Sequence, residues 1–189
     1  MAFVAGFVVR VIGGRYKGRR LKAPTWEGLR PTSDKLRETL FNILAPRIDG
    51  ARVLDGFAGT GAIGIEALSR GAAHVTFVEK DPRAAALIEA NLAACGIGAD
   101  YNVRRGDVLA ALRSPGAAFD LILLDPPYDL HPVSPTLEAA AACLSAEGLL
   151  VLERATRREP DVPATLTRVR DVKSGDSTLT FFEIANGES

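Results

Sequence analysis

The chain is poor in the residues that build disulfide frameworks and metal centres. Its 189 residues include two cysteines and two histidines. Cys95 and Cys143 are widely spaced and lie in apolar helical contexts, and His74 and His131 are isolated. We therefore predict neither a disulfide nor a zinc or other metal site. This cysteine usage fits a reducing cytoplasm.

Long apolar runs are also missing. No stretch approaches the ~20 apolar residues that a membrane-spanning helix needs. The apolar start, residues 2–9, has no basic segment and stops at Arg10, so we predict neither a membrane span nor a signal peptide. A hydrophobic content of 47% over 189 residues suits one α/β domain with a sizeable core.

The chain does contain the tetrapeptide Asp125-Pro126-Pro127-Tyr128, at the end of the apolar run 119–124. An exocyclic amine of a nucleobase is a poor nucleophile because its lone pair is delocalised into the ring. Asp125 and the Pro126 carbonyl could accept its two N–H groups, which would aim the lone pair at an electrophilic methyl. Two prolines stiffen the loop, and Tyr128 offers a face for stacking an extruded base. The tetrapeptide predicts catalysis of base methylation; the alternative is a plain turn after a strand.

A glycine-rich turn follows an earlier strand, over residues 55–64. The spacing Gly59-x-Gly61-x-x-Gly64 satisfies the dinucleotide fingerprint, and Glu79 lies where a ribose-binding acid belongs. A nicotinamide or flavin enzyme is therefore an alternative. Asp55 argues against it, because a carboxylate there would repel a pyrophosphate, whereas it suits the ammonium of S-adenosyl-L-methionine (SAM).

A third strand, residues 101–104, leads to Gly106-Asp107-Val108. Asp107 could accept the adenine amino group of SAM while the Val108 N–H meets a ring nitrogen. Equally, Asp107 could only cap a short helix over 108–113. The candidate cofactor contacts are Asp55, Gly56, Ala58, Gly59, Gly61, Glu79, Lys80, Asp107 and Val108.

The net charge of zero conceals a division along the chain. Residues 1–47 hold ten Lys and Arg against three acids, a balance of +7, and the remainder carries −7. Residues 7–21 read as a β-hairpin with a basic, glycine-rich tip. We expect this tip to contact a phosphate backbone; an ordinary charged turn is the alternative. The candidate RNA-binding residues are Arg15, Lys17, Arg19 and Arg20.

The order of elements predicts an α/β, doubly wound, mostly parallel sheet of seven strands. Apolar spacing indicates a helix from about Ser33. Strands near 51–55, 74–79, 101–104, 119–125 and 148–153 alternate with helices near 61–70, 82–95, 108–113 and 134–144. Residues 166–173 and 178–184 predict a C-terminal antiparallel hairpin. The ligand should lie at the carboxyl ends of the strands.

The chain resembles the bacterial RsmD group of 16S ribosomal RNA guanine-N2 methyltransferases, within the Rossmann-like class I SAM-dependent methyltransferases. The resemblance covers nearly the whole length and is most specific in residues 11–19, 29–34 and 37–42. It implies SAM as cofactor, catalysis at Asp125 to Tyr128 and RNA contact by the basic hairpin. The implied reaction is of the guanine-966 N2 type, and the implied partner is 16S rRNA in the small subunit or its assembly intermediate. Residues 1–30 would form the hairpin extension and 31–189 the methyltransferase domain. Ser174 departs from relatives, which often have an aromatic residue there.

Two further function classes stay open. A DNA or RNA adenine-N6 methyltransferase would share Asp125 to Tyr128, because the amine chemistry permits adenine N6, cytosine N4 and guanine N2 alike. Only 61 residues follow Tyr128, which leaves no separate domain for reading DNA sequence. A non-catalytic RNA-binding module would need the hairpin alone, and the intact Asp125 loop argues against it.

Overall fold

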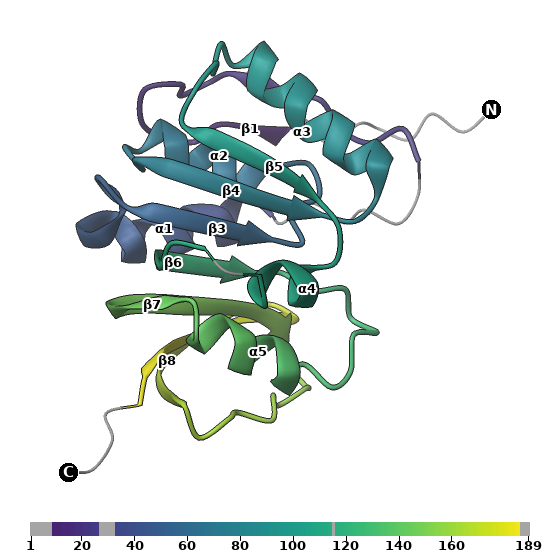
Figure 1. Cartoon of the computed structure of the whole chain (residues 1–189). Helices are drawn as coiled ribbons and strands as arrows, with labels where there is room; N and C mark the ends of the chain where they lie inside the picture. The colour runs from purple at the N-terminus through teal and green to yellow at the C-terminus, as the bar shows by residue number, and fades with distance from the viewer. Residues whose placement is uncertain (1–8, 27–32, 115, 186–189) are drawn as a thin grey trace.

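The computed structural model describes residues 9–26, 33–114 and 116–185. They form a seven-stranded sheet in the order β5-β4-β3-β6-β7-β9-β8 (Figure 1). The first five strands in this order, from β5 to β7, are parallel to one another. Strand β9 is antiparallel to both of its neighbours, β7 and β8. The strands are β3 Arg52–Gly56, β4 His74–Glu79, β5 Tyr101–Arg105, β6 Phe119–Leu124, β7 Leu144–Ala155, β8 Leu166–Ser174 and β9 Ser177–Ile184.

Helices cover both faces of this sheet, as short crossovers between parallel strands require. They are α1 Asp34–Ile48, α2 Ala62–Ser69, α3 Pro82–Ala94, α4 Val108–Leu112 and α5 Ser134–Ala141. The first three pack on one face, and α4 and α5 pack on the other (Figure 1). Each strand that enters a helix therefore ends at the same edge of the sheet.

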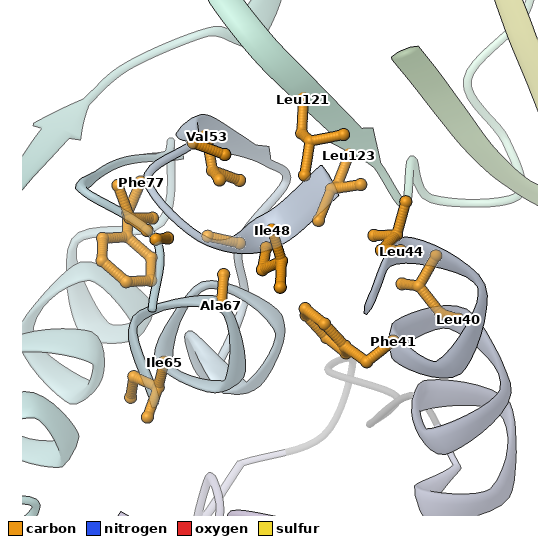
Figure 2. Packing of buried hydrophobic residues seen from close by; sticks show 14 of the residues in the cluster. Leu40, Phe41, Leu44, Ile48, Val53, Ile65, Ala67, Phe77, Leu121 and Leu123 are labelled. Atoms are coloured by element: carbon orange, nitrogen blue, oxygen red, sulfur yellow. The ribbon is translucent and has the colours of Figure 1, made fainter. Parts of the chain in front are cut away.

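The larger core lies between α1, α2 and the sheet. Phe41 and Leu44 of α1 are fully buried and face Leu123 of β6, while Ile65 of α2 lies near Phe77 of β4 (Figure 2). Ser33 caps α1 by accepting a hydrogen bond from the Leu36 N–H at 3.2 Å. Burying a large apolar side chain contributes roughly 1.5–3 kcal/mol, so these contacts fix α1 and α2 against the strands.

The N-terminal segment forms a small hairpin of β1 (Val9–Arg10) and β2 (Arg20–Leu21). Its apolar residues Val9, Val11 and Leu21 are buried in the larger core. The fully buried carboxylate of Glu66 in α2 accepts the Ile12 and Gly13 N–H groups, each at 2.8 Å. The hairpin is thus anchored to α2 by packing and by buried hydrogen bonds.

Removing the Glu66 carboxylate should test this anchor. Its Oε1 also pairs with Arg70 Nε at 2.7 Å, so Glu66→Ala leaves two backbone N–H groups and one guanidinium without their acceptor. We expect the free energy of unfolding to fall by about 3 kcal/mol or more. Glu89→Ala, at an exposed position of α3, should change it by less than about 0.5 kcal/mol. Urea unfolding of both variants makes the comparison, and equal stabilities would show that the anchor contributes little.

The structure confirms the predicted fold class, including both hairpins, with two local differences. The helix predicted over 134–144 ends at Ala141, and β7 begins at Leu144 rather than 148. Leu144 pairs with Phe119, and a register irregularity separates this pair from Leu121↔Leu149. Tertiary pairing therefore overrides the local helical pattern at these residues.

Candidate active site

Three acidic residues meet at the carboxyl edge of the sheet. Asp55 lies in β3, Glu79 ends β4 and Asp125 follows β6. These strands are adjacent and parallel, with β3 in the middle. Both other carboxylates act electrostatically on Asp55. The structure thus brings together three of the residues that the sequence singled out.

The glycine-rich turn wraps around two of these carboxylates. Asp55 Oδ2 accepts the Gly64 N–H at 2.9 Å, and Glu79 Oε2 accepts the Gly59 N–H at 2.9 Å. Gly61 has φ of 78°, in the left-handed region that favours glycine. A Cβ at Gly64 would lie 2.2 Å from the Phe77 ring. The turn is therefore shaped by close backbone approach, and α2 begins immediately after it.

Phe57 adopts φ of 61° in the same turn, which is unusual for an aromatic residue. Its side chain packs against the core under α4 and α5. Backbone strain of this kind costs about 1–3 kcal/mol and clusters at ligand-binding turns. The turn therefore holds a conformation that local preference alone would not select.

Burial changes the acidity of Asp55. Its exposed fraction is 2%, and loss of hydration raises the pKa of this carboxyl well above its ordinary value. The hydrogen bond from Gly64 opposes that rise, while the charges of Asp125 and Glu79 add to it. A cation placed among the three carboxylates would favour their ionised forms, so the cluster is suited to a positively charged ligand.

The end of β5 lies beside Glu79, because the Gly106 N–H donates to the Glu79 carbonyl at 3.0 Å. Asp107 is exposed and caps α4, with Oδ1 accepting the Ala110 N–H at 2.9 Å. The helix-capping alternative is therefore present in the structure. Asp107 Oδ2 makes no hydrogen bond within the described residues, so capping leaves one carboxylate oxygen for a ligand. Val108 is buried and Lys80 is exposed.

The loop after β6 presents Asp125 to Tyr128 at the same edge. The Asp125 N–H points to the Gly56 carbonyl at 3.4 Å, which ties the loop to the glycine-rich turn. The Pro127 carbonyl accepts the Leu130 N–H at 2.9 Å. The Pro126 carbonyl accepts no hydrogen bond from any described residue. Tyr128 is 43% exposed, so this residue is accessible at the edge.

Comparison with known proteins places this arrangement in a family. Residues 9–183 match the family described as Conserved hypothetical protein 95. The chain belongs to this family. Its sequence is 37% identical over 185 residues to Ribosomal RNA small subunit methyltransferase D of Escherichia coli, covering 96% of this chain and 93% of the relative. The enzyme of the same name from Haemophilus influenzae is 44% identical over 126 residues, or 65% of each chain. These matches confirm the predicted RsmD group.

A solved structure has the same fold. The putative methyltransferase yhhF from Escherichia coli superposes with a TM-score of 0.83 at 36% identity and covers 94% of this chain and 98% of its own. The family match over residues 9–183 includes every residue of the site described above. The solved structure therefore shares the fold that, in this chain, positions the three carboxylates.

Residues beyond the predicted set also build this site. A cavity of about 170 Å³ beside the loop is lined by Tyr128, His131, Glu153 and Arg158, among others. An Arg158 guanidinium nitrogen donates to the Tyr128 carbonyl and contacts His131 Nε2. Arg154 in turn donates to the Arg158 carbonyl at 2.8 Å. Arg158 is 30 residues from Tyr128, and nothing in the local sequence around it signals this contact.

The basic tip of the hairpin lies away from the three carboxylates. The Arg15 N–H donates to the Ser69 carbonyl at the end of α2, and Arg19 donates to the Cys95 carbonyl just after α3. Both helices end near the amino edge of the sheet (Figure 1). The Arg19 guanidinium thus docks the tip, although all four basic residues Arg15, Lys17, Arg19 and Arg20 are exposed. Both Arg15 and Arg19 stack on the Tyr16 ring.

Membrane-spanning helices and metal clusters are both missing from the described part of the chain. No helix there is long and apolar enough to cross a membrane. Among the same residues, no cluster of three or more His, Cys, Asp or Glu side chains could hold a metal ion.

Proposed function

We propose that the chain transfers the methyl group of SAM to the exocyclic N2 amine of a guanine in 16S rRNA of the small ribosomal subunit. The observation that carries this proposal is the junction of the Asp55 and Glu79 carboxylates with the Asp125 loop at one sheet edge. A cationic methyl donor fits the carboxylates, and an amine acceptor fits the loop. Relatives named ribosomal RNA small subunit methyltransferases support the RNA substrate.

The residues of the site fit SAM better than a dinucleotide. A pyrophosphate in the glycine-rich turn would face the carboxylates of Asp55 and Glu79, whereas the ammonium and sulfonium of SAM would be attracted to them. Asp55 would hold the ammonium, Glu79 the ribose hydroxyls, and Asp107 with Val108 the adenine. Glu79 oxygens already accept two backbone N–H groups, but each carboxylate oxygen has a second lone pair for a hydroxyl.

SAM supplies an electrophilic methyl group, and the chain's residues prepare the acceptor. Asp125 and the Pro126 carbonyl accept the two N–H groups of the base amine and hold its lone pair toward the methyl. Tyr128 stacks on the base. The hydrogen bond from Arg158 to the Tyr128 carbonyl keeps this loop in place. The Pro126 carbonyl, without a described partner, is consistent with its proposed role.

Product analysis tests the proposal and separates it from adenine-N6 methylation. Small subunits isolated from cells without the gene would be incubated with the enzyme and SAM, and their nucleosides analysed by mass spectrometry. We expect N2-methylguanine. Finding N6-methyladenine would replace the guanine assignment, and finding no methylated nucleoside would reject the activity on RNA.

The substrate should be an assembled or partly assembled subunit rather than short naked RNA. One catalytic domain with a small hairpin offers little surface for reading sequence, so selectivity must come largely from an RNA shape that exposes one base. The same assay with a short oligonucleotide tests this point. Equal rates on the oligonucleotide and the subunit would contradict it.

The hairpin is proposed to contact RNA through Arg15, Lys17 and Arg20, the exposed basic residues of the predicted set other than Arg19. Replacing all three by Ala should lower the slope of log K against log salt for RNA binding by roughly 2 to 3. Arg19 is left in place because it docks the tip. Fluorescence anisotropy over a salt series measures the slope, and SAM affinity provides the control. An unaltered slope would make the tip an ordinary charged turn.

A further inference from the structure

A second cavity lies on the face of the sheet that α4 and α5 cover, away from the carboxyl edge. Its volume is about 500 Å³. Residues at or near the starts of β3 and β4 line it together with β5 and the end of α4. Its polar lining includes Arg52, His74, Asn102, Arg104, Arg113 and Ser114. We call this cavity the cationic cleft.

The alternation of the strands explains why this part of the sheet is polar. Leu54 and Val78 lie on the face beneath α4 and are buried there. Arg52 and Arg104 point to the same face by the two-residue period of a strand. α4 has only five residues, Val108–Leu112. Parallel sheets are usually covered and apolar on both faces. The polar, open lining of the cationic cleft departs from this pattern and therefore suggests a function.

The charge of the cleft is unbalanced. Within the described residues, the guanidinium groups of Arg52, Arg104 and Arg113 form no ion pair or hydrogen bond. Six other arginines do pair with carboxylates: Arg37, Arg47, Arg70, Arg83, Arg154 and Arg168. No Asp or Glu among the described residues lines the cleft. Convergent like charges repel one another, and a bound anion would relieve that repulsion.

Two acids are adjacent in sequence to lining residues. Glu138, beside Ala139, accepts the Thr165 hydroxyl at 3.0 Å. The other is Asp120, which follows Phe119. Its carboxylate accepts the Arg52 N–H at 2.9 Å and the Ser145 hydroxyl at 3.0 Å. Those bonds hold it against the backbone of Arg52 and the side chain of Ser145. The guanidinium groups therefore remain the main charges of the cleft, alongside the neutral amide of Asn102.

We infer that the cationic cleft binds backbone phosphates of the RNA whose base is methylated at the carboxyl edge. This inference rests on the proposed function. Guanidinium groups suit phosphate oxygens by charge and by geometry. A strand of six residues such as β4 spans roughly 20 Å, and phosphates along one nucleic-acid strand recur about every 3.4 Å or more. One RNA segment is long enough to reach both the cleft and the Asp125 loop.

The test removes two charges from the cleft and two from elsewhere. Arg52→Gln/Arg104→Gln is compared with Arg170→Gln/Lys173→Gln, which changes exposed residues of β8. Binding of a 16S rRNA transcript is followed by fluorescence anisotropy over a salt series. We expect the cleft variant to bind about tenfold more weakly and to lower the salt slope by roughly 1.5, with little change in the control variant. Thermal unfolding and SAM affinity should match the wild type in both.

The outcomes separate the cleft from the methylation proposal and from other anions. A cleft variant whose salt slope equals that of the wild type would overturn the inference. Binding of inorganic pyrophosphate is measured by calorimetry as well. If the cleft variant loses this binding but keeps the salt slope for RNA, the cleft would bind a small phosphorylated ligand, and the inference that it binds RNA would be overturned. The binding assay contains no SAM, so its result does not depend on methyl transfer. A lower salt slope in the cleft variant, together with no methylated product from the wild type, would support the cleft and reject the proposed reaction.

Discussion

An Asp125→Ala enzyme is expected to bind SAM nearly normally and to lose most of its methyl transfer. The proposed partner of Asp125 is the amine of the target base, so its carboxylate acts when the nitrogen attacks. Removing one such electrostatic contact typically lowers the rate of the chemical step by about 10²- to 10³-fold. The loss of an acidic neighbour of Asp55 should change the cofactor site only modestly.

Single-turnover assays with saturating enzyme measure the chemical step, and calorimetry measures SAM affinity separately. Asp129→Ala is the matched control, because Asp129 is an exposed acid four residues along the same loop. It should retain a near-normal rate. If Asp125→Ala also kept a near-normal single-turnover rate, the catalytic role would be rejected and the loop would be an ordinary turn after a strand. A parallel loss of SAM affinity would instead place Asp125 in the cofactor site.

The arrangement at the carboxyl edge could be predicted because it depends on short-range signals. Each buried strand ends in an acidic residue or leads to one, and parallel strands bring such ends together. Asp55, Glu79 and Asp125 therefore followed from strand boundaries, which the alternation of strands and helices predicts well. The boundary between α5 and β7 did not follow, because the pairing of Leu144 with Phe119 is a long-range contact.

Contacts between distant segments explain what the sequence could not predict. Glu66 lies in an apolar helix, and its role depends on Ile12 and Gly13, more than 50 residues earlier. Arg37 is another example: it is fully buried, and its Nη2 bonds to the Arg10 carbonyl. The same anchoring places the basic tip near the ends of α2 and α3 rather than beside Asp125. Counting charges along the sequence identified the basic segment, but it could not predict where in the fold that segment lies.

Replacing Asp55 by asparagine is expected to stabilise the free protein and weaken SAM binding. The substituted side chain would be neutral, and its amide oxygen could still accept the Gly64 N–H, so the turn should be kept. The ionised form of Asp55 is disfavoured by burial and by two neighbouring carboxylates. Asp55→Asn should therefore raise the Tm at neutral pH by at least about 2 °C and lower SAM affinity about 10- to 100-fold through loss of the charged acceptor.

The pH dependence gives the sharper test. Because the pKa of Asp55 is raised in the folded state, the folded protein holds this proton in a pH range where the unfolded chain has released it. The stability that this difference contributes is present below the ordinary carboxyl pKa and is lost as pH rises through the folded pKa. SAM, a cation, favours the ionised carboxylate, so its affinity should rise with pH over the same range. Calorimetry in buffers of different ionisation heat should detect proton release on SAM binding in the wild type and less in Asp55→Asn. The exposed control Asp176→Asn should behave as the wild type, and proton release that persists unchanged in Asp55→Asn would show that another group titrates.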